Sequence, residues 1–133
     1  MITAVDHIGI AVRSIEERLL LYRTLGLELA GSEEVPSEKV RVAFLPVGDT
    51  RVELLEPTTP DSPVARFLEK RGEGLHHICF VVLDIRGAME ALAALGFELL
   101  SEEPRAGAHG SLVCFLHPRS AGGVLIELSQ PGG

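Results

Sequence analysis

The sequence predicts an α+β fold in which two βαβββ modules form a curved, barrel-like sheet of eight mixed strands. The main observation is a repeat at an offset of 70 residues. Residues 5–12 (VDHIGIAV) return as residues 75–82 (LHHICFVV), and residues 25–29 (LGLEL) return as residues 95–99 (LGFEL). A repeat of this size indicates two copies of one supersecondary unit that share a sheet.

The two copies also end alike, because residues 52–57 (VELLEP) resemble residues 126–131 (IELSQP). A chain of 133 residues has the length of a single domain. We therefore expect one domain with module one over about 1–57, a linker and short helix over about 58–73, and module two over about 74–131.

The first module begins with an alternating, Ile- and Val-rich strand over residues 2–12. Ser14 is a candidate cap for a helix over about 15–25, and Gly26 stands at its stop position. Three further strands are expected at about 27–34, 39–46 and 50–56.

The linker ends at a short helix over about 63–71, which Ser62 caps and Gly72 follows. The second module then repeats the order of the first. Its elements are expected as a strand at 75–82, a helix at 85–95 and strands at about 97–102, 111–117 and 123–129.

Each copy carries a histidine on its first strand. Because side chains alternate along a strand, His7 shares its face with Gly9 and Ala11. The same rule makes His77 the counterpart of His7 and turns His76 to the opposite face. A pseudo-twofold relation between the copies would bring His7 and His77 to one point.

Each copy also carries an isolated carboxylate in an apolar strand, Glu53 in the first and Glu127 in the second. Taken singly, each carboxylate fits a solvated or hydrogen-bonded position, and each histidine fits a buried imidazole with a partner. A shared divalent cation accounts for all four together, because imidazoles and carboxylates are ligands such ions select. We therefore predict a metal site of His7, Glu53, His77 and Glu127.

Charge and hydropathy exclude several classes of partner. A formal net charge of −7 argues against nucleic acid, and an anionic ligand would need local cations. No apolar run approaches the ~18 residues of a membrane span, so we expect a cytoplasmic protein without membrane contact. Cys79 and Cys114, which lack CxxC spacing, are expected as buried reduced thiols. The candidate cations are Lys70, Arg71, Arg105 and Arg119.

These residues resemble the vicinal oxygen chelate superfamily, the glyoxalase–bleomycin resistance group, and within it the methylmalonyl-CoA epimerase family. The resemblance spans nearly the whole chain. The segments that carry it are residues 6–12 (DHIGIAV), 52–57 (VELLEP), 74–79 (GLHHIC), 107–110 (GAHG), 115–118 (FLHP) and 122–128 (GGVLIEL).

The resemblance implies that His7, His77 and Glu127 are metal ligands, while some members have Gln at the position of Glu53. It implies a divalent cation, with Co²⁺ usual in assays and Zn²⁺, Ni²⁺, Mn²⁺ or Mg²⁺ as alternatives. It also implies a homodimer and an isomerase of propionate metabolism, which interconverts (2R)- and (2S)-methylmalonyl-CoA, a coenzyme A thioester, through an enolate that the cation stabilises.

Inversion of the carbon centre needs acid/base groups on both faces of the planar enolate. The resemblance makes Glu127 one catalytic group. Several epimerases have another carboxylate just before the third strand, where this chain reads Lys39-Val40-Arg41-Val42-Ala43, with Glu38 nearby. The alternatives are a glyoxalase I-like lyase or isomerase with the same ligands, and a non-catalytic drug-binding protein on the same fold.

Overall fold

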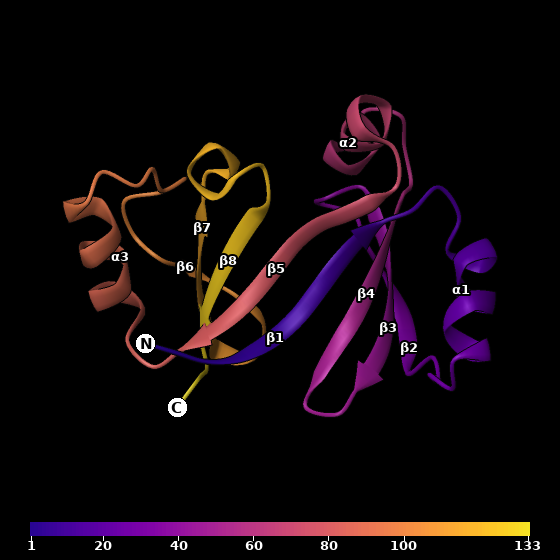
Figure 1. The fold of residues 1–133 in the computed structure, drawn as a ribbon, viewed down its shortest axis with the longest axis horizontal. Coiled ribbons are helices and arrows are strands. Elements are labelled where there is room, and N and C mark those ends of the chain that lie inside the picture. Colours follow the sequence, from indigo (N-terminus) through magenta and orange to yellow (C-terminus); the bar gives the residue numbers. More distant parts are fainter. The chain divides into compact units, whose positions relative to one another are not determined.

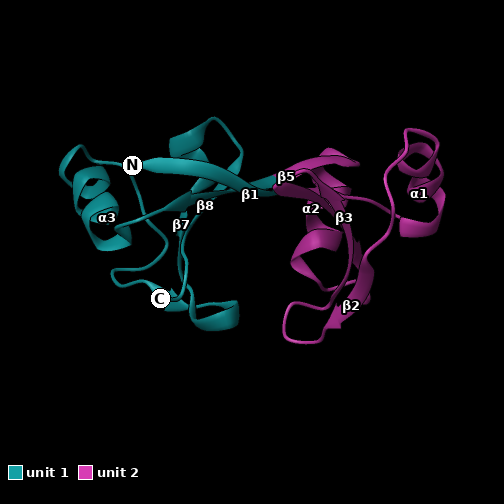
Figure 2. Ribbon diagram, turned by 90° about the horizontal axis from the view of Figure 1, so that it is seen from below, with its two compact units in different colours: residues 1–7, 77–133 teal, residues 8–76 magenta.

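The computed structural model describes residues 1–133, which form two compact units. One unit is residues 8–76, and the other joins residues 1–7 to residues 77–133; Figure 2 colours them separately. Strand β1 (Ile2–Ala11) and strand β5 (Gly74–Val82) each contribute residues to both units.

The unit of residues 8–76 holds two helices and three complete strands. These are α1 (Ile15–Thr24), β2 (Gly31–Val35), β3 (Val40–Val47), β4 (Thr50–Pro57) and α2 (Pro63–Arg71). Helix α1 begins after Ser14, whose hydroxyl oxygen accepts a hydrogen bond from the Glu17 amide. It ends before Gly26, whose φ of 95° suits glycine. Helix α1 lies beside the strands of its unit (Figure 1).

Two apolar clusters hold this unit together. Against α1 the buried residues are Val12, Ile15, Leu19, Ala43, Leu45 and Leu54. Against α2 they are Ala11, Val40, Val42, Leu55, Val64 and Leu68. Consecutive residues of β3 and β4 thus divide between the two clusters, as the alternation of side chains along a strand requires.

The other unit contains α3 (Ile85–Ala94), β6 (Arg105–Ala106), β7 (Leu112–Leu116), β8 (Leu125–Gln130) and two short 3₁₀ turns (Ala108–Gly110 and Pro118–Ala121). The Asp84 carboxylate caps α3 by accepting a hydrogen bond from the Gly87 amide. The buried apolar cluster of this unit consists of Val82, Ile85, Ala88, Met89, Cys114 and Leu128. Cys79 and Cys114 are buried and neither forms a disulfide, which confirms the prediction of buried reduced thiols.

The eight strands follow the order β2-β3-β4-β1-β5-β8-β7-β6, so the sheet is open rather than closed. The pairs β1–β4 and β5–β8 are parallel. The pairs β2–β3, β3–β4, β6–β7 and β7–β8 are antiparallel. The predicted α+β class with an eight-stranded mixed sheet is confirmed. None of the three α-helices, of 9 or 10 residues each, has the length and apolar character to cross a membrane.

The strand expected at about 97–102 is the main correction to the elements. Only Leu99 forms an isolated bridge, to Leu116, and the strand β6 comes later. The Ser101 hydroxyl donates to the Glu103 carbonyl and closes a local turn, and Pro104 lacks an N–H for the ladder. The expected strand at 27–34 likewise starts later, at Gly31, because the Leu27 amide bonds back to the carbonyl of Tyr22.

Candidate metal centre

The two predicted histidines meet within the unit that contains residues 1–7 and 77–133. His7 lies on β1 with 8% of its surface exposed, and His77 lies on β5. Their Nε2 atoms are 3.0 Å apart, and the two rings are edge to face at an interplanar angle of 84°. The structure therefore brings together the two histidines that strand alternation places on one face.

Glu127 of β8 completes a cluster with these histidines. It pairs in register with Cys79, two residues after His77, so strand alternation puts it on the histidine face. Its Oε1 is 3.6 Å from His7 Nε2, and its side chain is 15% exposed. One ligand atom from each of His7, His77 and Glu127 lies within 4.8 Å of the others.

The donor set and its spacing fit one divalent cation. Two imidazole nitrogens that each bind one ion at about 2.0–2.1 Å can be at most about 4.2 Å apart, and the two Nε2 atoms lie within this limit at 3.0 Å. Two imidazoles and a carboxylate suit a borderline divalent ion such as Co²⁺, Ni²⁺ or Zn²⁺ better than a soft ion that selects thiolates. These three side chains could hold such an ion.

Glu53, the fourth predicted ligand, belongs to the unit of residues 8–76. It lies on β4, is 7% exposed and pairs with Gly9 of β1. Gly9 follows His7 by two residues, just as Cys79, the partner of Glu127, follows His77. The first copy thus repeats the strand register that places Glu127 on the histidine face in the second.

Arg51 is a neighbour of Glu53 that the sequence analysis did not identify. Its Nε donates a hydrogen bond of 2.7 Å to Glu53 Oε2. The two residues are two positions apart on β4, so they share a face. The sequence does contain a signal for this contact, because Arg51 stands two residues before the predicted ligand Glu53 on the same strand. The hydrogen bond from the guanidinium stabilises the charge of the buried carboxylate.

The remaining histidines have other contacts. The His76 ring packs edge to face on Phe67 with centroids 5.0 Å apart, and burial lowers the pKa of His76. His117 Nδ1 accepts the Arg119 amide at the start of the second 3₁₀ turn. His109 adopts the left-handed conformation with a φ of 54°. The packing of His76 on Phe67 agrees with a structural role for His76.

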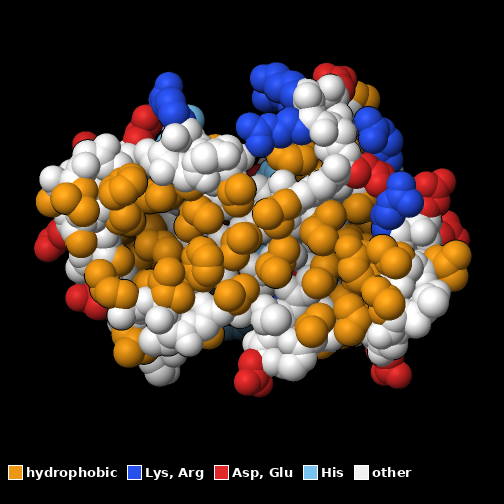
Figure 3. Space-filling view, viewed as in Figure 1, with side chains coloured by type: hydrophobic (Ala, Val, Ile, Leu, Met, Phe, Trp, Pro, Cys, Tyr) orange, Lys and Arg blue, Asp and Glu red, His pale blue; other side chains and the backbone are white.

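The candidate cations have local explanations. Lys and Arg side chains gather around α2 in Figure 3. Lys70 and Arg71 lie in the last turn of this helix, where their positive charges interact favourably with the negative end of the helix dipole. The Arg71 guanidinium is also 5.8 Å from the centre of the Phe67 ring. Arg119 forms an ion pair of 2.9 Å with Glu98.

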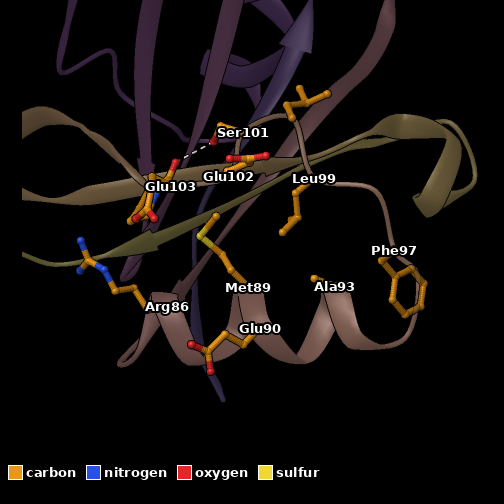
Figure 4. Close-up of a pocket in the computed structure, with 11 residues that line it drawn as sticks. Arg86, Met89, Glu90, Ala93, Phe97, Leu99, Ser101, Glu102 and Glu103 are labelled. Carbon is orange, nitrogen blue, oxygen red and sulfur yellow. Dashed lines mark hydrogen bonds between the residues drawn. The ribbon is translucent and has the colours of Figure 1, made fainter.

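An open groove of about 540 Å³ lies between α3 and the segment that follows it (Figure 4). Glu90, Glu102 and Glu103 line it together with Arg86 and apolar side chains. None of the four predicted metal ligands lines this groove. The chemistry of the histidine cluster, rather than the size of a groove, therefore identifies the candidate site.

A model of the Glyoxalase/Bleomycin resistance protein/Dioxygenase superfamily matches residues 6–115. The chain belongs to this superfamily. It is 44% identical over 133 residues to the ethylmalonyl-CoA/methylmalonyl-CoA epimerase of Cereibacter sphaeroides, covering 98% of this chain and 99% of that protein. It is 42% identical over 127 residues to human mitochondrial methylmalonyl-CoA epimerase, covering 94% of this chain and 72% of that protein.

Solved structures of the superfamily agree with this assignment. A variant of Streptomyces coelicolor methylmalonyl-CoA epimerase, in complex with 2-nitronate-propionyl-CoA, is 38% identical and has a TM-score of 0.84. That match covers 100% of both chains. The resemblance to methylmalonyl-CoA epimerases that the sequence segments carry is therefore confirmed along the whole chain.

Proposed function

We propose that this isomerase is a metal-dependent methylmalonyl-CoA epimerase that interconverts the (2R) and (2S) thioesters. The observation that carries the proposal is the convergence of His7, His77 and Glu127 in a chain of the epimerase family. The proton to be removed lies between a thioester carbonyl and a carboxylate, and a site with this donor set suits a substrate with two neighbouring oxygens.

His7, His77 and Glu127 would hold the cation, with Glu53 as a fourth ligand. The repeated strand register supports Glu53, because it stands to His7 as Glu127 stands to His77. When bound, a divalent ion supplies the positive charge that stabilises charge developing on the substrate oxygens. Co²⁺ is the first ion to test, followed by Zn²⁺, Ni²⁺, Mn²⁺ and Mg²⁺.

Glu127 is the proposed acid/base group on one face of the substrate. On β3, Phe44 pairs with Glu53 and Val42 pairs with Leu55, so this face of β3 is apolar. Arg41 points to the opposite face, where it pairs with Glu34. Strand β3 therefore offers no carboxylate for the second face, and Glu53 is the group to test there.

The deciding experiment follows exchange of the substrate α-proton with solvent deuterium, beside a coupled assay of methylmalonyl-CoA turnover. Metal-stripped protein should be inactive, and a divalent ion should restore both signals. Exchange reports proton removal even when net turnover is small. No exchange after reconstitution would contradict the proposal, and turnover of a glutathione hemithioacetal instead would favour the glyoxalase I-like alternative.

A cytoplasmic homodimer is the expected state of the protein. Support for association comes from large exposed apolar side chains, which include Leu83 at 75% and Leu95 at 79% exposure. Hydrophobic side chains also gather over the strands on the face shown in Figure 3. Light scattering coupled to size-exclusion chromatography tests the dimer directly, and a single species of monomer mass would contradict it.

A further inference from the structure

We propose that Asp6 is a positioning residue that fixes the ring orientation and the tautomer of His7. Asp6 Oδ2 lies 2.8 Å from His7 Nδ1. The inference deepens the proposed function, on which it rests for the presence of a metal at this site.

The contact determines which ring nitrogen of His7 carries the proton. A carboxylate oxygen accepts hydrogen bonds, so the 2.8 Å contact favours the tautomer of His7 that carries its proton on Nδ1. Nε2 then presents a lone pair, and this is the nitrogen that faces His77 Nε2 at 3.0 Å and Glu127 Oε1 at 3.6 Å. Asp6 thus directs the Nε2 lone pair of His7 toward His77 and Glu127.

Strand geometry does not produce this contact by itself. Side chains of consecutive residues leave a strand on opposite faces, so adjacent Asp6 and His7 are not neighbours by register. The Asp6 carboxylate must turn back toward the His7 ring. Its side chain is 36% exposed, whereas that of His7 is 10% exposed, so the contact connects a partly solvated charge to a buried imidazole.

The sequence repeat supplies an internal comparison. The residue that corresponds to Asp6 in the second copy is His76, one position before His77. The His76 ring packs on Phe67 instead of supplying a carboxylate. A carboxylate behind a ligand imidazole fixes its orientation and raises its basicity, and its loss typically weakens metal binding about 10–100-fold. We expect this effect at His7 through residue 6 and not at His77 through residue 76.

The first test reads the His7 tautomer in metal-free protein by long-range proton–nitrogen NMR. Wild-type His7 should show the Nδ1–H form, and Asp6→Ala should lose that preference. Asp6→Asn retains an acceptor oxygen without the charge and should give an intermediate result. The matched control His76→Asn changes the corresponding residue of the second copy and should leave the His7 signals in the Nδ1–H form.

The second test titrates Co²⁺ into the same proteins and records visible absorption. Asp6→Ala should bind about 10–100-fold more weakly than wild type, and His76→Asn should bind as wild type does. An unchanged tautomer together with unchanged affinity in Asp6→Ala would overturn the positioning role. A thiolate charge-transfer band would also overturn it, because the ion would then occupy the cluster of Asp6, His7 and Cys79.

Failure of this inference is distinguishable from failure of the proposed function. If wild-type protein bound no divalent ion, the metal-dependent epimerase proposal would fail, while the metal-free NMR measurement would still decide whether Asp6 sets the tautomer. If metal bound and the α-proton exchanged but Asp6→Ala behaved as wild type, only the role of Asp6 would be rejected.

Discussion

The Nε2 atoms of His7 and His77 are 3.0 Å apart although 70 residues separate them in the chain. Each imidazole lies on the first strand of its copy, and Glu127 approaches the pair from β8. The repeat explains why this convergence is visible in the sequence: one strand motif occurs twice and brings two imidazoles to the same place.

Metal binding should stabilise the protein as well as activate it. A ligand that binds only the folded state adds about 2.7 kcal/mol when present at 100 times its Kd. We expect Co²⁺ to raise the melting temperature of the wild-type protein. The melting temperature of His77→Ala should change little when Co²⁺ is added. The exposed His109 provides the control: His109→Ala should retain the full shift, and a shift in His77→Ala equal to that of wild type would place the ion elsewhere.

Replacement of Glu127 should have the largest effect on proton transfer. Glu127→Gln keeps the size of the side chain but cannot accept the substrate proton, so we expect a loss of ~10²–10⁴-fold, plus any loss of metal affinity. The measurement is deuterium exchange into each epimer separately, at saturating metal. Full exchange from both epimers would show that the base is another residue.

Glu53→Gln should be milder than Glu127→Gln. An amide oxygen can still coordinate a cation, so the variant should keep the metal and lose activity modestly. If Glu53 acts only as a ligand, exchange from the two epimers should fall by similar factors. Selective loss of exchange from one epimer would instead identify Glu53 as the second acid/base group.

The sequence predicted the features that depend on periodicity and repetition. Strand alternation was sufficient to choose His77 over His76, and the order of strands and helices followed from the duplicated segments. The strand expected at 97–102 failed because a turn near Ser101 and Pro104 interrupts pairing there. Alternation could not show the contact of Asp6 with His7, because it assigns adjacent side chains to opposite faces.

The ion pair between Lys39 and Asp61 should make the stability of the folded protein depend on pH in acid. Hydrogen bonds from Lys39 and Thr59 lower the pKa of Asp61 to about 2. Because the pKa is lower in the folded state than in the unfolded state, this contribution is present above the unfolded pKa near 4 and disappears as the pH falls toward about 2. Asp61→Asn should therefore lose less stability than wild type over that range.

Urea unfolding at a series of pH values checks this prediction. The pair is exposed, so added salt should reduce the difference between Asp61→Asn and wild type. Glu33→Gln, which changes an exposed carboxylate on β2, is the control and should follow the wild-type acid dependence more closely. Identical acid dependence of Asp61→Asn and wild type would show that the Lys39 contact contributes no measurable stability.

The contact of Arg51 with Glu53 should stabilise the fold before any metal binds. Arg51→Met removes the guanidinium that donates at 2.7 Å to a carboxylate only 7% exposed. Hydrogen bonds to charged groups contribute about 1.5–3 kcal/mol, and we expect a loss of that order in the free energy of unfolding of metal-free protein. In the Glu53→Gln background the same Arg51→Met change should cost less, because the charge it compensates is gone. Urea unfolding of the two single variants and the double variant measures this coupling, and strict additivity would show that Arg51 acts independently of Glu53.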